Sequence, residues 1–319
     1  MCSVSFSLAG QTATTIPVTL LHGSAPSEIK SVPAFGWYDF PKGDDAGNLY
    51  FHPDPPEFSS PVILKLPAGT DDDAVVYKVP DKGDDSCEYR AFSVTRAGSV
   101  AMIADCKEGT MIVHFLSDGS VSSRTVLDIA KGFDPSRVFA VFDSGVAIVG
   151  GSFNRTAPKP LLGTSLFGVF SPSGKLLRRL DGLAGIDKSA KPKFYEGYAA
   201  FGSDGLLYIL QPNEEIVVMS ESGEIVRTIQ YHKTVRDAIA SHIVVSGNLA
   251  VVELHIVSNP SELSRILLLV INLATGETFR LYEADPELGR GMVNFSSKDG
   301  FTFLRLSKGR LQKMTAPLH

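Results

Sequence analysis

Basic residues recur along this chain just before, or at the start of, short apolar segments. They are Lys30, Arg90, Arg137, Lys193, Arg236 and Arg290. If those segments are strands around one central channel, the six cations meet at one channel mouth and would attract an anionic ligand or an acidic partner loop. Acidic residues interleave with them, at Glu88, Asp134, Glu196, Asp237 and Glu287. A solvated rim of compensating charges is therefore the competing interpretation, since surface ion pairs are ordinary.

Cys87 and Cys106 are predicted to face each other across a β-hairpin. A turn at Arg96 and Ala97 pairs residues whose numbers sum to 193, and these two cysteines satisfy that condition. Opposed Cβ atoms lie about 4.5–5.5 Å apart, so a small adjustment would allow a disulfide. A one-residue bulge would break the register and leave two buried thiols. An oxidised pair would favour an extracytoplasmic or secreted location.

Two groups of residues have the side-chain types of metal ligands. His52, Asp54 and Glu57 lie in the loop HPDPPEF, while Glu253 and His255 alternate on one predicted strand and so share a face. Imidazole and carboxylate groups can hold a divalent ion, but neither spacing fixes a third ligand. A polar loop and a solvent-facing strand are the simpler interpretations. We assign no metal and no other cofactor, and a Ca²⁺ or Zn²⁺ ion in the channel stays open.

The elements that would position these residues come from a sequence motif that the chain repeats six times. The motif is a Gly-centred turn followed by a strand in which apolar residues alternate. The marker glycines are Gly47, Gly98, Gly145, Gly205, Gly247 and Gly300. An apolar strand precedes each marker turn, a third strand follows, and a second Gly turn leads to a polar outer strand in five units. A strand-rich unit of about 40–50 residues is typical of a β-propeller blade.

We therefore predict an all-β chain in which residues 1–319 form one six-bladed β-propeller with four antiparallel strands per blade. The blades begin near residues 32, 88, 137, 194, 237 and 291. The last unit ends after its third strand, whereas the apolar segment 14–21 precedes the first unit. We predict that this N-terminal strand completes the last blade and closes the ring, which removes exposed sheet edges. An open solenoid is the alternative.

Residues 203–229, SDGLLYILQPNEEIVVMSESGEIVRTI, resemble the NHL repeat of six-bladed propellers, and the other units match that pattern more loosely. The resemblance covers nearly the whole chain and points to the NHL-like, gluconolactonase-like and TolB-like propellers. These relatives include scaffold modules, metal hydrolases and receptor ectodomains. The resemblance therefore implies a fold and no single activity.

The sequence is compatible with two functions. The first is a non-catalytic module that binds a protein partner or an anionic ligand at one channel mouth. Three long loops, residues 52–61, 151–163 and 255–265, would lie beside the basic ring and enlarge that surface. The alternative is a metal-dependent hydrolase of the lactonase type, whose ligand set no motif assigns. The sequence also contains no Gly-x-Ser-x-Gly elbow and no phosphate-binding loop.

The composition and the N-terminal sequence bear on the possible partners and the location of the protein. The formal net charge of −5 argues against a nucleic-acid partner, which would usually require a basic domain. No apolar run reaches the roughly 18 residues of a membrane span, and a monomer is expected. The start MCSVSFSLAG lacks the pattern of a secretory signal. It fits a cytosolic chain or a trimmed mature form, and Cys2 raises the alternative of a processed lipoprotein end.

Overall fold

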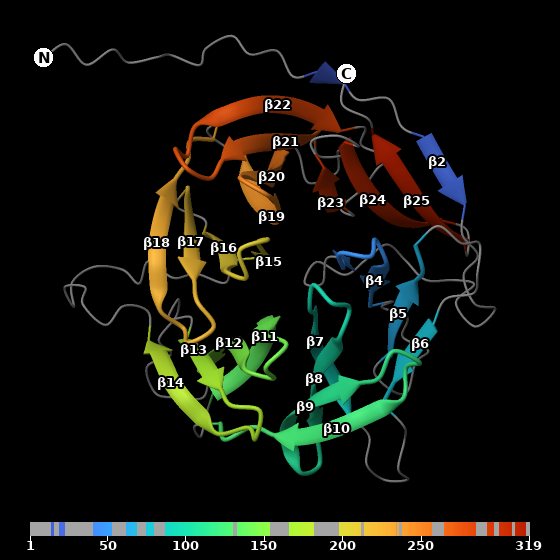
Figure 1. The fold of residues 1–319 in the computed structure, drawn as a ribbon, viewed down its shortest axis with the longest axis vertical. Helices are drawn as coiled ribbons and strands as arrows, with labels where there is room; N and C mark the ends of the chain where they lie inside the picture. Colours follow the sequence, from blue (N-terminus) through green and yellow to red (C-terminus); the bar gives the residue numbers. More distant parts are fainter. Residues whose placement is uncertain are drawn as a thin grey trace, which may run out of the picture.

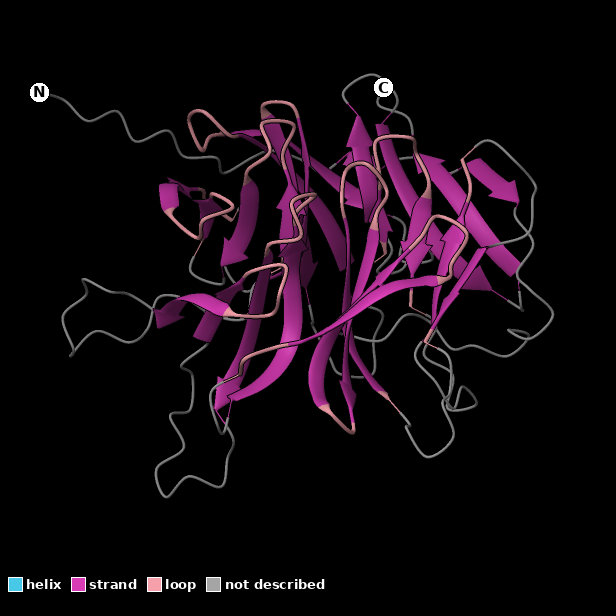
Figure 2. Ribbon diagram, turned by 60° about the horizontal axis from the view of Figure 1, so that its bottom comes forward, coloured by secondary structure: helices cyan, strands magenta, loops and turns pink. Residues whose placement is uncertain are grey.

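All the regular structure in the described residues is β-strand. The computed structural model describes residues 14–15, 19–22, 41–52, 62–68, 75–79, 87–129, 133–153, 166–181, 198–211, 214–233, 235, 238–256, 265–284, 292–296, 300–307 and 310–316. Figure 2 shows the strands and the loops that join them. Over these ranges no helix is long and apolar enough to cross a membrane.

The strands of the described ranges form six sheets, and the first three follow the chain in order. The first contains β3 (Lys42–Gly43), β4 (Leu49–Phe51), β5 (Val62–Leu66) and β6 (Val75–Lys78). The second contains β7 (Glu88–Val94), β8 (Val100–Cys106), β9 (Gly109–Phe115) and β10 (Val121–Val126). The third contains β11 (Phe133–Val141), β12 (Ala147–Phe153), β13 (Leu166–Phe170) and β14 (Leu176–Asp181).

The other three sheets include the two N-terminal strands. The fourth sheet contains β15 (Ala199–Phe201), β16 (Leu207–Gln211), β17 (Glu215–Met219) and β18 (Ile225–Gln230). The fifth contains β19 (Ile239–Ser246), β20 (Leu249–Ile256), β21 (Arg265–Asn272), β22 (Thr278–Ala284) and β1 (Thr14–Thr15). The last contains β23 (Met292–Ser296), β24 (Gly300–Ser307), β25 (Arg310–Ala316) and β2 (Thr19–His22).

The sheets are arranged radially, with the first strand of each nearest the centre, as predicted for a β-propeller (Figure 1). Each of these innermost strands contacts the next one along the chain, and β23 also contacts β3. The apolar side chains between neighbouring sheets form the core. For example, Tyr208 and Leu210 of the fourth sheet pack with Val252 and Leu254 of the fifth.

Five sheets have the predicted four strands, and all pairs within them are antiparallel. The fifth sheet differs because β1 pairs with β22 in parallel as an additional strand. The segment predicted as one strand, residues 14–21, is thus divided between two sheets. Its second part, β2, pairs antiparallel with β25 in the register Thr19↔Thr315. The predicted first strand at residues 32–40 lies outside the described residues.

The marker glycines adopt the left-handed backbone that the sequence predicts for them. All six have φ between +57° and +89°. This region disfavours residues with a Cβ, which explains why the repeat is centred on glycine. Each marker turn connects an innermost strand to the second strand of its sheet, so the six turns lie at one end of the propeller.

The second turns use glycine for an additional reason, which is close packing between sheets. A Cβ built at Gly119 would collide with the carbonyl oxygen of Val76, and one at Gly174 with that of Val126. A Cβ at Gly276 would collide with the carbonyl oxygen of Gln230. Each of these carbonyls belongs to the outer strand of the preceding sheet. The second turn of one sheet therefore lies directly on the neighbouring sheet.

This packing predicts different costs for two alanine substitutions at the same backbone angle. Gly205 and Gly276 both have φ +76°, but a Cβ at Gly205 would meet nothing within 4 Å. We expect Gly205→Ala to cost about 1–2 kcal/mol from its backbone conformation, and Gly276→Ala to cost roughly 1–3 kcal/mol more from the collision. Urea unfolding of both variants measures this difference. Equal costs would contradict the packing explanation.

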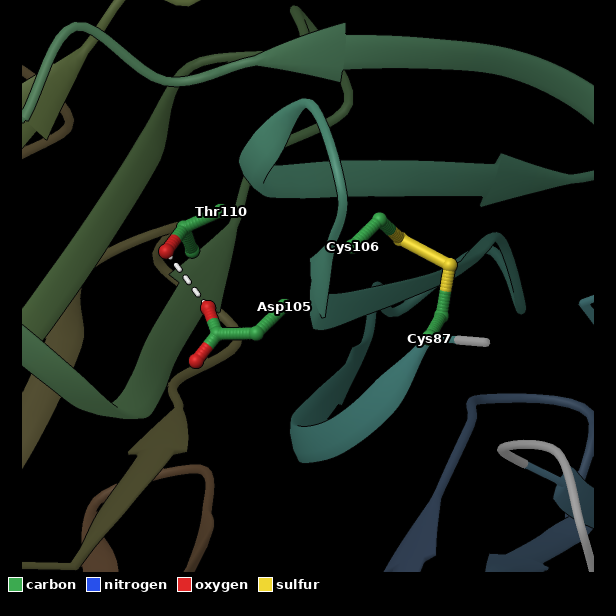
Figure 3. The surroundings of a disulfide bond; sticks show 4 residues. All are labelled: Cys87, Asp105, Cys106 and Thr110. Atoms are coloured by element: carbon green, nitrogen blue, oxygen red, sulfur yellow. Dashed lines mark hydrogen bonds between the residues drawn. A yellow bond between two sulfur atoms is a disulfide. The ribbon is translucent and has the colours of Figure 1, made fainter. Parts of the chain in front are cut away.

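Cys87 and Cys106 lie next to each other, as the sequence predicts, and form the disulfide that the sequence left open (Figure 3). Their Cα atoms are 4.2 Å apart and the cysteines are separated by 19 positions. On a chain-entropy argument, closing a loop of this length contributes about 3 kcal/mol to stability. The predicted turn position is slightly wrong, because Val94 pairs with Val100. A bulge at Arg90 corrects the offset, so that Glu88 pairs with Asp105 beside the cysteines.

Candidate functional site

A cavity of about 340 Å³ lies between the innermost strands, and all six sheets contribute to its wall. Lys42 comes from β3, Ser93 from β7, Phe139 from β11, Phe201 from β15, His242 from β19 and Phe295 from β23. Residues of the marker turns also line the cavity, among them Asp45, Arg96 and Ser203. The cavity therefore occupies the half of the channel nearer the marker turns.

The predicted basic ring would lie at the opposite end of the channel, where the innermost strands begin. Lys30, Lys193, Arg236 and Arg290 lie outside the described residues, and for Arg137 in β11 only the backbone is described. The parts of the three predicted loops at residues 53–61, 154–163 and 257–264 also lie outside them. Apart from Arg90, the ring therefore stays a prediction.

The Arg90 side chain is paired on its own hairpin. Its Nε donates a hydrogen bond of 2.7 Å to Oδ2 of Asp105, and its Nη2 lies 2.7 Å from the same oxygen. A second carboxylate oxygen, Oε2 of Glu88, lies 3.7 Å from Nη2. Asp105 also accepts a hydrogen bond from Thr110 beside the disulfide (Figure 3). For this residue, the contacts favour compensating surface charges over a ligand contact.

Arg96 joins three marker turns at the end of the channel where the cavity lies. Its Nε and Nη2 donate hydrogen bonds of 3.1 Å and 2.6 Å to the two carboxylate oxygens of Asp45 in the first turn. Its Nη1 donates a hydrogen bond of 3.3 Å to the carbonyl oxygen of Gly202 in the fourth turn. The backbone N–H of Asp45 donates in return to the carbonyl oxygen of Arg96. The guanidinium thus holds the turns of the first, second and fourth sheets together.

The first marker turn holds a buried carboxylate against a tyrosine. Asp44 accepts hydrogen bonds from the backbone N–H and side-chain amide of Asn48, at 2.9 Å and 2.7 Å, and from the Tyr50 hydroxyl at 2.8 Å. Burial and these contacts with Asp44 raise the pKa of Tyr50 well above its ordinary value. The fourth turn repeats this arrangement, because the Tyr208 hydroxyl donates to Asp204 at 2.7 Å. An Asp–Tyr hydrogen bond is thus present in two of the marker turns, the first and the fourth.

His242 is a buried histidine in the cavity wall, with a side chain that is only 5% exposed. Burial is the main cause that lowers its pKa to about 3, and the positive charge of Lys42 acts in the same direction. A backbone hydrogen bond with Met292 opposes the shift. His242 is consequently neutral near pH 7. Lys42 itself also lies over the Phe92 ring, with its Nζ 5.3 Å from the ring centroid.

Glu253 and His255 share a face of β20, as predicted, but that face is buried and not solvent-facing. Glu253 is 0% exposed and pairs directly with His242 across the strands. Its Oε1 lies 2.6 Å from Nε2 of His255 and accepts a hydrogen bond of 3.3 Å from Ser241, which is the extra residue of a bulge in β19. Glu253 and His255, on the second strand of the fifth sheet, therefore lie next to His242 on the innermost strand.

The second metal candidate is described only in part. His52 donates through Nδ1 to the carbonyl oxygen of Val62 at 2.7 Å and stacks on Tyr89, with ring centroids 3.6 Å apart. Asp54 and Glu57 lie outside the described residues. Within the residues that are described, no three or more His, Cys, Asp and Glu side chains gather closely enough to hold a metal ion.

Comparison with known proteins identifies the fold class. No known protein family and no curated protein sequence matches this chain. A structure of a DUF4221 family member from Bacteroides vulgatus has a TM-score of 0.57 at 11% identity, over 94% of this chain and 97% of that chain. A catalytically inactive virginiamycin B lyase from Staphylococcus aureus, solved with quinupristin, has a TM-score of 0.45 at 14% identity, over 94% and 99%. At 11% identity, the likeness to the DUF4221 family structure shows the fold alone. Together with the radial arrangement of the sheets, it makes this chain a β-propeller protein.

Sequence reasoning missed the residues that line the cavity. Lys42, Arg96 and His242 lie close to marker glycines in the sequence, which was the available signal. Lys42 and His242 each lie five residues before their marker glycines, Gly47 and Gly247, whereas Arg96 lies two residues before Gly98, so no single repeated position connects all three. The six basic residues predicted as a ring would lie where the innermost strands begin, at the end of the channel opposite the marker turns.

The low pKa of His242 predicts a specific loss of stability in acid. Between about pH 3 and pH 6.5 the unfolded chain binds a proton at this residue that the folded chain does not bind. Stability from His242 is therefore complete above pH 6.5 and falls as the pH decreases, by at most about 1.4 kcal/mol per pH unit. Urea unfolding at pH 7 and pH 5 should show a smaller loss for His242→Gln than for the unchanged chain.

The control for that experiment is His232→Gln, because the His232 side chain is 86% exposed. This control should retain the acid-induced loss of the unchanged chain. An identical pH dependence in all three proteins would show that His242 titrates normally in the folded state.

Proposed function

We propose that this chain is a non-catalytic binding module, a single-domain six-bladed propeller whose channel cavity takes a small ligand. The observation that carries the proposal is the cavity of about 340 Å³ lined by all six innermost strands. Sites for small molecules commonly have volumes of about 300–1,000 Å³ and combine an apolar wall with a few polar groups. This cavity has both, with three phenylalanines beside Lys42, Arg96 and His242.

The polar groups of the cavity suit holding a ligand better than activating a water molecule. Asp44 already accepts three hydrogen bonds, and Asp45 is bound through both carboxylate oxygens. A lactonase-type hydrolase needs a carboxylate that can take a proton or hold an ion. These engaged carboxylates favour binding over hydrolysis in the marker-turn half of the channel.

Six blades and a ring closed by the N-terminal strand belong to this proposal. They are supported by the six sheets of the described residues, by the contact of β23 with β3, and by the pairing of β2 with β25. A rigid closed ring would hold the cavity wall in place without a ligand.

Two truncations test the closure. Removing residues 1–17 deletes β1 and retains β2, whereas removing residues 1–22 deletes both and exposes the β25 edge. We expect the longer truncation to lower the melting temperature much more than the shorter one, because it removes a strand from the last sheet. If the longer truncation melts like the full chain, the N-terminal strand does not close the ring.

A tryptophan at the cavity mouth tests the binding function. Ser246 lines the cavity and is half-buried, so Ser246→Trp should fill the space while leaving the sheets intact. Saturation-transfer NMR with millimolar benzoate, phenyl phosphate, hexanoate, benzamide and benzylamine gives the readout. We expect signals for the unchanged chain that Ser246→Trp loses and the matched control Ser222→Trp, in an exposed outer turn, retains. Equal signals from both variants would show that the cavity is not the binding site.

A further inference from the structure

Two cations, Lys42 and Arg96, line the cavity from neighbouring sheets. Lys42 belongs to the innermost strand of the first sheet, and Arg96 to the marker turn of the second. The positive charge of Lys42 is one of the causes that lower the pKa of the buried His242 in the same wall. Because His242 is neutral near pH 7, it adds no charge of its own there.

Two carboxylates, Asp44 and Asp45, belong to the same wall as these two cations. Asp44 is 8% exposed, and its oxygens are occupied by donors from Asn48 and Tyr50. The Asp45 side chain is 60% exposed and its charge is partly screened by solvent. A negative group in the cavity would therefore compete with Asp45 for Arg96.

Arg96 also retains hydrogen-bonding capacity. A guanidinium has five N–H groups, and its bonds to Asp45 and Gly202 use three of them. The bond to Gly202 is the longest of the three, at 3.3 Å, and its acceptor is neutral, so it is the weakest. An entering carboxylate or phosphate could accept from the remaining donors or replace the Gly202 carbonyl, since such charge-assisted bonds are stronger than bonds to a neutral acceptor.

The cavity wall also contains apolar side chains. Phe139, Phe201 and Phe295 come from three different sheets, and Val94 and Val245 add aliphatic surface. Buried apolar area favours a ligand with an aromatic or aliphatic body. A volume of about 340 Å³ also limits this body to a small molecule.

We infer that the cavity takes a small organic anion, whose carboxylate or phosphate group binds Lys42 and Arg96 and whose apolar body packs against the three phenylalanines. This inference rests on the proposed binding function and specifies its ligand class. It assigns the anion to the marker-turn end of the channel, away from the ring predicted at the other end.

The test compares matched anionic and neutral probes on the full chain. Benzoate and benzamide have nearly the same shape, as do hexanoate and hexanamide, and phenyl phosphate tests the second head group. Titration calorimetry should show benzoate binding about 10- to 100-fold more tightly than benzamide, because charge-assisted bonds are lost in the neutral probe. Higher salt should weaken benzoate binding and leave benzamide binding nearly unchanged.

Substitutions of Lys42 and Arg96 then test whether these two residues bind the anionic group. Lys42→Met and Arg96→Gln should each weaken benzoate about tenfold or more. The matched controls Lys175→Met and Arg178→Gln alter exposed residues of the third sheet and should bind benzoate normally. Because Arg96 joins three turns, Arg96→Gln is interpreted only if its melting temperature is unchanged. Otherwise Lys42→Met and the benzoate–benzamide comparison decide.

The outcomes separate the two proposals. If benzamide or benzylamine binds as tightly as benzoate and Ser246→Trp abolishes this binding, the anion inference is overturned and the binding function stands. If Lys42→Met binds benzoate normally, the assignment of the anion to this end of the channel is wrong. If none of the probes binds the unchanged chain, or Ser246→Trp has no effect on binding, both proposals fail.

Discussion

The left-handed backbone of the marker glycines is the constraint on which the cavity depends. A positive φ at these positions reverses the chain tightly after each innermost strand. The six innermost strands therefore end at the same level, and their turns surround one end of the channel. Arg96, Asp45 and Ser203 reach the cavity only because their turns are at that end.

The same turns also couple the sheets to each other. Arg96 reaches from the second turn to the first and the fourth, while the second-turn glycines lie on the outer strand of the preceding sheet. Contacts of these two kinds link the sheets both beside the channel and at their outer strands, in addition to the apolar core between the sheets. A channel wall that is held in place by contacts beside the channel and at the outer strands is preorganised, so a ligand would not have to order it on binding.

The sequence predicts the elements well where each depends on local geometry. Alternation along one strand places Glu253 and His255 on one face, and the structure confirms that they lie close together. The prediction that this face meets solvent is wrong, because the last sheet covers it, with Val251 on the same face packed against Phe303. Burial of a strand face is set by its neighbour, and the pattern of one strand does not contain that information.

The disulfide illustrates the same division between local and non-local information. Hairpin pairing brings Cys87 and Cys106 together, but the bulge at Arg90 that completes the register has no signal in the sequence. By itself, the sequence determined the repeat, the glycine turns and the all-β propeller, since each follows from backbone conformation within a few residues. Only the tertiary structure decided that Lys42, Arg96 and His242 share one cavity. Their approach depends on how separate sheets pack around the channel, and the sequence of one repeat does not contain that information.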